Sequence, residues 1–215
     1  MISSDAVVLL AGASGELGRA VARSLLDRGA RVAAAVARAW QVEKLQEQLR
    51  DDLGAAACDR LLASVVAPRD AQAAAGFVKG SRDALGTVTD YVAASRLWHN
   101  AQAGKEPAAD LEELLDANLF GNATLARALL PSFRRARAGR LQFLVAAEDG
   151  DAWLRASAST RASLSGLRSY AEALRDELAN DGDAPCVSLV AVDGSGDGSK
   201  DGVSAQAFEA ALKAI

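Results

Sequence analysis

The sequence predicts an α/β fold: a doubly wound parallel sheet of about six strands with helices on both faces. Three observations carry this prediction. Short apolar runs alternate with longer stretches of helical periodicity along the whole chain. The first apolar run passes directly into a glycine-rich turn that opens a helix. Half of the 215 residues are hydrophobic, which is enough to form a sizeable core.

Strands are expected wherever an apolar run of strand length ends in turn residues, because parallel strands buried on both faces read as continuous hydrophobic segments. Gly12 follows the first such run, and Pro68 closes the third. The expected strands are 5–11, 31–37, 61–67, 87–94, 141–147 and 186–192.

Helices are expected between the strands, where apolar residues recur at helical spacing. A weak helix carrying Gly76 and Gly80 is expected after the third strand, and Pro131 is expected to kink a later one. The other expected helices are 16–28, 40–53, 110–135, 155–180 and 205–214. A Gly/Ser/Asp-rich loop is expected at 193–202. We expect residues 1–215 to form a single domain, truncated after the sixth strand and a closing helix.

Composition excludes several classes of function. The net charge is −4 without a basic stripe, which argues against nucleic acid or an anionic membrane as partner. No apolar stretch of about twenty residues predicts a membrane span, and the first residues lack the pattern of a signal peptide. Cys58 and Cys186 are expected to be free, buried thiols, which favours a cytoplasmic protein. His99 is the one histidine, so no metal site is expected.

The turn after the first strand is the strongest local motif. It reads Ala11-Gly12-Ala13-Ser14-Gly15-Glu16-Leu17-Gly18 and opens a helix, which is the context of a phosphate-binding turn in a Rossmann-like fold. The candidate nucleotide-binding residues there are Gly12, Ser14, Gly15, Glu16 and Gly18. Glu16 weakens the prediction, because a carboxylate in the first helical turn caps amides itself and repels a pyrophosphate.

Arg38 follows the second strand, which has no acidic residue to hold a ribose hydroxyl. An arginine there favours NADP over NAD if either binds, since a guanidinium can pair with a 2′-phosphate. A solvated arginine at a strand end explains the same residue equally well.

The pattern as a whole resembles the short-chain dehydrogenase/reductase (SDR) family over nearly the whole chain. The glycine turn is similar to that family's Thr-Gly-x-x-x-Gly-x-Gly, with Gly15 one place early. Asn118 matches the asparagine of the family's fifth helix. Residues 139–145 resemble the lead into the strand that ends in the catalytic serine, and residues 166–178 resemble the later part of the catalytic helix.

The resemblance implies that most of the catalytic set is missing. The family's serine falls on Ala146 or Ala147, its tyrosine on Ser157 and its lysine on Arg161, so Asn118 alone survives. The chain has no lysine between positions 105 and 200, so no shift of the alignment restores the Tyr-x-x-x-Lys pair. The family's Asn-Asn-Ala-Gly falls on Ala94-Ser95-Arg96-Leu97, and its Pro-Gly falls on Asp193-Gly194.

The losses matter because SDR chemistry needs a titrating phenol. The family's tyrosine passes a proton while hydride moves to or from nicotinamide, and a neighbouring ammonium lowers its pKa from about 10. A serine hydroxyl at position 157 is far too weakly acidic for this role. Arg161 keeps the charge but cannot exchange a proton. Tyr170 lies 13 residues further on, about 20 Å along a helix.

Two residues leave room for divergent chemistry. Asn118 either acts in catalysis or satisfies a backbone group at a helix kink. His99 lies just past the fourth strand and either serves as an acid or base near neutral pH or is an exposed loop residue.

The predicted helices 110–135 and 155–180 suggest an assembly role, because small residues at helical spacing allow helix backbones to approach closely. The alternative is that these faces pack only on their own sheet. In the resembled family the two helices pair across subunits as a four-helix bundle. The small residues are Ala117, Gly121, Thr124 and Ala128 in the first helix, and Ala158, Ser159, Ala162, Ser163, Gly166 and Ala173 in the second.

The resemblance therefore implies a catalytically degenerate subunit that pairs with an active SDR homologue as a hetero-oligomer, with a heterotetramer expected. One precedent in the family is 2-[hydroxy(phenyl)methyl]succinyl-CoA dehydrogenase, which pairs an inactive member with an active one. We then expect no cofactor in this chain. The alternatives are a divergent NADP-dependent oxidoreductase that uses Asn118, His99 and Arg161, and a nucleotide-sensing regulator that performs no chemistry.

Overall fold

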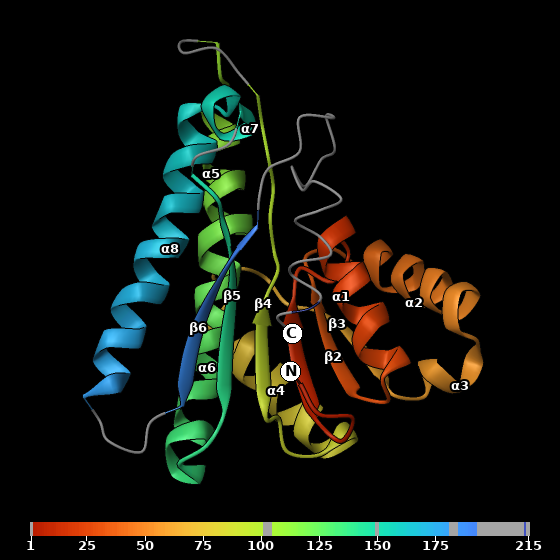
Figure 1. Cartoon of the computed structure of the whole chain (residues 1–215). Coiled ribbons are helices and arrows are strands. Elements are labelled where there is room, and N and C mark those ends of the chain that lie inside the picture. Colours follow the sequence, from red (N-terminus) through yellow and green to blue (C-terminus); the bar gives the residue numbers. More distant parts are fainter. Residues whose placement is uncertain (1, 101–104, 149–150, 181–184, 193–212, 214–215) are drawn as a thin grey trace.

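The expected sheet is present and parallel throughout. The computed structural model describes residues 2–100, 105–148, 151–180, 185–192 and 213 (Figure 1). Its six strands run in the order β3-β2-β1-β4-β5-β6, which is the doubly wound order of a Rossmann-like fold. The strands are β1 (Val7–Ala11), β2 (Arg31–Val36), β3 (Leu61–Val65), β4 (Asp90–Ala93), β5 (Arg140–Ala146) and β6 (Cys186–Val192).

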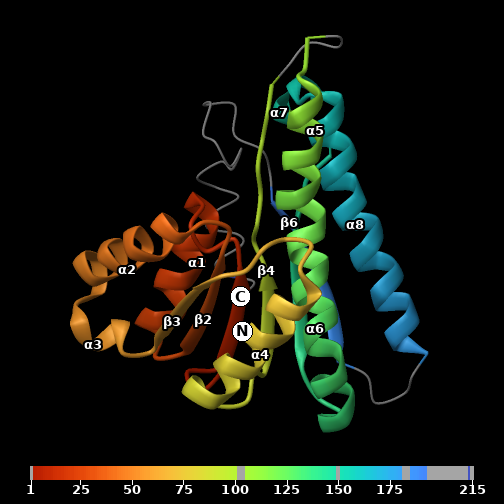
Figure 2. The same cartoon turned by 180° about the vertical axis from the view of Figure 1, so that it is seen from behind.

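Helices cover both faces of the sheet (Figures 1 and 2). One face packs against α1 (Glu16–Asp27), α2 (Ala39–Leu53) and α3 (Ala55–Cys58). The other packs against α4 (Ala71–Leu85), α6 (Gly121–Ala136) and α8 (Ala158–Ala179). The remaining helical elements are α5 (Ala108–Leu115), the π-helical turn η1 (Asp116–Phe120) and α7 (Asp151–Arg155).

Strand β1 explains how the two cores form. Its five residues are all buried, and successive side chains point to opposite faces. Val8 and Leu10 enter the core beneath α1 and α2, while Leu9 enters the core beneath α4, α6 and α8. Each fully buried leucine contributes about 1.5–3 kcal/mol, so a continuous apolar strand supports both layers at once.

The structure corrects three helix predictions. The helix expected over 155–180 is broken at residues 156–157, where Ser157 caps α8. The helix expected over 110–135 contains the π turn η1, which sequence spacing did not indicate. The helix expected to be weak is a regular one, α4, because Asp70 accepts from the amides of Gln72 and Ala73 at its start. Sequence analysis also missed the short helices α3 and α7.

The prediction that both cysteines are buried was wrong. Cys186 is exposed and Cys58 is half-buried, and both are free thiols. Cys186 is exposed because it begins β6, which is an edge strand among the described residues. The loop expected at 193–202, Asp193-Gly194 within it, and nearly all of the helix expected at 205–214 lie outside the described residues. None of the helices in the described ranges combines the length and hydropathy of a membrane span.

Candidate functional site

The candidate site lies at the carboxyl ends of the central strands. The chain order reverses between β1 and β4, and ligands of doubly wound sheets bind in the crevice at such a switch point. The predicted site residues form two groups there. The turn after β1 and the end of β2 make the first group, and the ends of β4 and β5 with the start of α8 make the second.

The glycine turn has the tight geometry that a phosphate-binding turn requires. Gly12 has a φ of 73°, and a Cβ added to it would lie 2.2 Å from the Cα of Ser95. A Cβ on Gly18 would lie 2.0 Å from the Gly12 carbonyl oxygen. Gly15 is the N-cap of α1 and supplies no side-chain cap, while its amide donates to the Gly12 carbonyl. The glycines therefore hold the tight turn that a dinucleotide-binding motif requires.

The side chains around this turn are exposed and carry mixed charge. Ser14 and Glu16 are both exposed, with Glu16 in the first turn of α1, where a carboxylate opposes a bound anion. Arg38 is the N-cap residue of α2, and its Nη2 lies 3.6 Å from Oε1 of Glu113 on α5. Both partners of this ion pair are more than half exposed, so the pair contributes little stability.

Ser157, which the sequence resemblance aligns with the family's tyrosine, is a buried helix cap. Its side chain is 2% exposed and accepts a hydrogen bond from the Thr160 amide at 3.1 Å. Its hydroxyl donates to Oε1 of Glu106 at 2.6 Å, and the Ser159 hydroxyl donates to Oε2 at 2.6 Å. These two hydrogen bonds lower the pKa of the Glu106 carboxyl, because they stabilise its charged form. The serine is thus committed to holding the start of α8.

The Asn118 side chain also has a structural role, because its polar atoms are hydrogen-bonded within the chain. It is fully buried in the π turn η1. Its Oδ1 accepts from the Leu97 amide at 2.6 Å, and its Nδ2 donates to the Leu97 carbonyl at 2.9 Å and to the Ser163 hydroxyl at 2.8 Å. The side chain therefore fastens the segment after β4 to α8, which corresponds to the structural alternative in the sequence analysis.

Two tryptophans cover the family's serine position. Ala146 is 2% exposed and belongs to a small buried cluster with Trp98, Trp153 and Leu164. The tryptophan rings make an edge-to-face contact, with centroids 6.4 Å apart and planes at 62°. Arg161, at the family's lysine position, places its guanidinium carbon 5.3 Å from the Trp153 ring centroid. Arg161 therefore stacks on the outside of the cluster.

Neither tyrosine supplies the missing phenol. Tyr91 is fully buried in β4 and donates to the Asn122 carbonyl at 2.7 Å. Burial raises the pKa of Tyr91 well above its ordinary value, and burial also raises the pKa of Tyr170. SDR chemistry needs a shift in the opposite direction. Tyr170 packs edge-on against Phe143, with ring centroids 6.1 Å apart.

His99 lies close to the start of α8 and to a carboxylate. Its amide donates to Thr160 Oγ1 at 3.0 Å, and its carbonyl accepts from the Ser157 amide at 3.1 Å. Its Nδ1 is 3.3 Å from Oδ2 of Asp110 on α5. The side chain is about a quarter exposed, so the prediction of an exposed loop histidine is wrong.

The second group therefore brings together most of the predicted catalytic positions: Asn118, Ala146, Ser157, Arg161 and His99 all contribute to one region. Sequence analysis missed Glu106 and Asp110, because a carboxylate that caps a distant helix leaves no pattern in the sequence. It also missed that Trp153 fills the space, although a tryptophan in a chain so poor in aromatic residues was an available signal. Within the described ranges, no three metal-ligating side chains converge.

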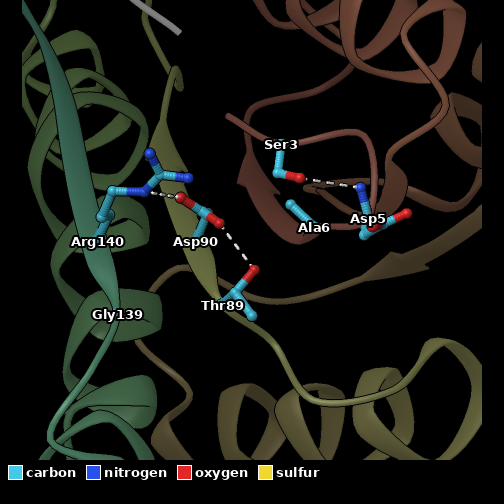
Figure 3. A pocket seen from close by; sticks show the side chains of 7 residues that line it. All are labelled: Ser3, Asp5, Ala6, Thr89, Asp90, Gly139 and Arg140. Atoms are coloured by element: carbon cyan, nitrogen blue, oxygen red, sulfur yellow. Dashed lines mark hydrogen bonds and ion pairs between the residues drawn. The ribbon is translucent and has the colours of Figure 1, made fainter. Parts of the chain in front are cut away.

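A hollow of about 370 Å³ lies at the opposite, amino-terminal edge of the sheet (Figure 3). Arg140 pairs there with the buried carboxylate of Asp90, which also accepts from the Thr89 hydroxyl at 2.7 Å. The two charged residues face each other in the register of β4 and β5. This pair aligns the two strands, and it stands away from the switch point. The lining consists of Ser3, Asp5, Ala6, Thr89, Asp90, Gly139 and Arg140.

Comparison with known proteins identifies a family match over most of the chain. The sequence model of the short chain dehydrogenase family matches residues 6–194. No curated protein matches the sequence significantly.

Solved structures with the same fold are numerous. A short chain dehydrogenase from Mycobacterium smegmatis superposes with a TM-score of 0.78 at 19% identity, covering 97% of this chain and 84% of that chain. A short chain dehydrogenase/reductase from Burkholderia phymatum, solved in complex with NAD, superposes with a TM-score of 0.75 at 18% identity, covering 90% and 68%. A short-chain dehydrogenase from Streptomyces avermitilis reaches 25% identity with a TM-score of 0.70, covering 88% and 66%.

Proposed function

This chain belongs to the short-chain dehydrogenase family, and from that membership we propose that it is a non-catalytic subunit. It assembles with an active homologous NAD(P)-dependent alcohol or hydroxyacyl-CoA dehydrogenase and supports that enzyme. The observation that carries the proposal is the state of residue 157. The position that the sequence resemblance aligns with the family's titrating phenol holds a buried serine here, and its hydroxyl contacts with Glu106 and with the amide and hydroxyl of Thr160 fix the start of α8.

The other residues aligned with the family's catalytic positions do not replace the phenol. Ala146 has no polar side-chain atom, and Arg161 places its guanidinium over the Trp153 ring. The side-chain amide of Asn118 is hydrogen-bonded to the Leu97 backbone and the Ser163 hydroxyl. A hydride step without a coupled proton donor loses the general acid-base contribution, which is typically 10²–10⁴-fold. The chain therefore supports slow chemistry at most.

Assembly is supported by the outward face of α8. Ala158, Ala162 and Ala173 are all exposed, so this long helix presents small side chains to solvent. Gly166 differs from them, since a Cβ there would lie 3.4 Å from Leu119 and within the chain's own core. The proposed partner contacts are therefore on α8 and, from the family resemblance, on residues 110–135 of α5, η1 and α6, in a heterotetramer with the active homologue.

Co-expression tests this proposal. The chain is produced with a homologue that has an intact Tyr-x-x-x-Lys pair and is encoded beside it, and the complex is weighed by native mass spectrometry. We expect a mixed oligomer that Ala162→Arg disrupts. The matched control is Ala75→Arg, which puts the same side chain at an exposed alanine of α4. Homo-oligomers only, with a fully active homologue on its own, would remove the proposal.

A divergent NADP-dependent oxidoreductase is the second candidate, and the pair of His99 with Asp110 favours it. A histidine oriented by a carboxylate is a common general base. This candidate requires turnover by the chain alone that His99→Gln abolishes. If turnover is absent, or survives that change, the second candidate fails.

A further inference from the structure

We propose that the nucleotide site of this chain is a half site, which takes an adenosine 5′-diphosphate group and excludes the nicotinamide half of a dinucleotide. The inference rests on family membership and on the burial of the two groups of site residues. It does not depend on the proposed partner, because a half site requires only this chain.

The adenosine half of the crevice is open. Ser14, Ala37 and Arg38 are exposed at the ends of β1 and β2. The turn after β1 keeps the tight packing of a dinucleotide-binding motif, since a Cβ on Gly12 would overlap the backbone of Ser95 and a Cβ on Gly18 would overlap Gly12. Two carboxylates lie near this half: Glu16 in the first turn of α1, and Glu113, which pairs with Arg38. Both side chains are exposed and can turn toward solvent.

The nicotinamide half is closed. Hydride transfer requires the nicotinamide to lie within contact distance of the substrate, and the family's serine and tyrosine hold that substrate. In this chain those positions are Ala146 and Ser157, each 2% exposed. Trp98 and Trp153 occupy the adjoining space and are themselves 8% and 4% exposed. A nicotinamide ring therefore has no surface to occupy beside either position.

Hydrogen bonds hold the residues on either side of Trp98. The Asn118 side chain binds the backbone of Leu97, the residue before Trp98: it accepts from the Leu97 amide and donates to the Leu97 carbonyl. The backbone of His99, the residue after Trp98, is bonded to Ser157 and Thr160. Opening this half would break these bonds and expose two aromatic rings to water. Figure 1 shows α1 and α2 on one side of β4 and α7 and α8 on the other, so the elements that carry the two groups of site residues lie on opposite sides of β4.

The consequence is a specific order of affinities. A dinucleotide should bind through its adenosine diphosphate end, with the nicotinamide ribose projecting into solvent. The nicotinamide then adds no contacts, so ADP and NAD⁺ should have similar dissociation constants. An ordinary dehydrogenase site, closed around both halves, gains affinity from each.

Calorimetric titration of the purified chain with ADP, ADP-ribose and NAD⁺ tests this order. We expect all three ligands to bind with dissociation constants within about fivefold of one another. We also expect dihydronicotinamide fluorescence to stay at its solvent value when NADH binds. A larger advantage for NAD⁺, a shifted NADH emission, or no binding of ADP overturns the half site.

A second test adds a negative charge to the glycine turn after β1. Ser14→Glu adds a carboxylate to the open half at an exposed position, so the fold should survive. We expect it to weaken ADP and NAD⁺ equally, by about tenfold or more. The control is Ser4→Glu, the same change at an exposed residue before β1, where affinity should not move. Unequal weakening of the two ligands contradicts the proposal.

Discussion

Replacing Trp153 by alanine should destabilise the protein strongly, because the indole is buried in a small apolar cluster at the end of β5. The side chain is 4% exposed and packs with Trp98, Ala146 and Leu164. Truncating a buried tryptophan to alanine costs about 3–5 kcal/mol, through lost burial and the cavity left behind. The edge-to-face contact with Trp98 accounts for about 0.5–1.5 kcal/mol of this.

Urea unfolding followed by circular dichroism measures the change. The control is Leu154→Ala, the adjacent residue, which is 68% exposed and should change the free energy of unfolding by about 0.5 kcal/mol or less. A double-mutant cycle with Trp98→Ala should return the aromatic coupling. If Trp153→Ala costs under about 1 kcal/mol, the indole is not part of a packed cluster, and the interpretation of a filled site is refuted.

Further changes test the other contacts. Asn118→Ala removes three hydrogen bonds and should cost about 2–4 kcal/mol in urea unfolding; a loss near zero contradicts its structural role. The pKa of Glu106 is lowered in the folded state, so its carboxylate contributes stability above the unfolded pKa of about 4.3, and this contribution is lost as pH falls toward the folded value. Glu106→Gln should therefore flatten the fall of the unfolding free energy at acid pH. An unchanged pH profile would contradict the role of Glu106 at the start of α8. Gly12→Ala should cost about 2 kcal/mol or more, since its φ is 73° and Ser95 is too close, whereas Gly76→Ala, with open space around it in α4, should stabilise by about 0.5–1 kcal/mol. Thermal melts that rank these two glycine changes in the reverse order would contradict the assigned conformations.

The sheet could be predicted from the sequence because its signals are local. Each strand is a short apolar run, and the glycine-rich turn that begins at Gly12 marks where β1 ends and α1 follows. The parallel, doubly wound arrangement followed from the alternation of strands and helices and from the handedness of crossovers, whereas the strand order came from the structure. The breaks in the two long helices could not be predicted this way. The π turn around Asn118 and the cap at Ser157 depend on Leu97 and Glu106, which are distant in sequence.

The sequence could predict which of the family's catalytic residues are replaced in this chain. It could not predict which side chains fill the space beside them. Comparing Ser157 and Arg161 with the family motif needs only alignment. The filling by Trp98 and Trp153 depends on how α7 folds back beside the end of β5, which no spacing encodes. The carboxylate of Glu106 likewise becomes meaningful only when the start of α8 is placed against it.

The most direct measurement is nicotinamide absorbance during incubation of the chain, purified alone, with NAD⁺ or NADPH and panels of alcohols and carbonyl compounds. We predict no turnover above the rate without protein. A robust rate that disappears in Ser157→Ala or Arg161→Ala would contradict the central claim, because these side chains would then be catalytic and not structural.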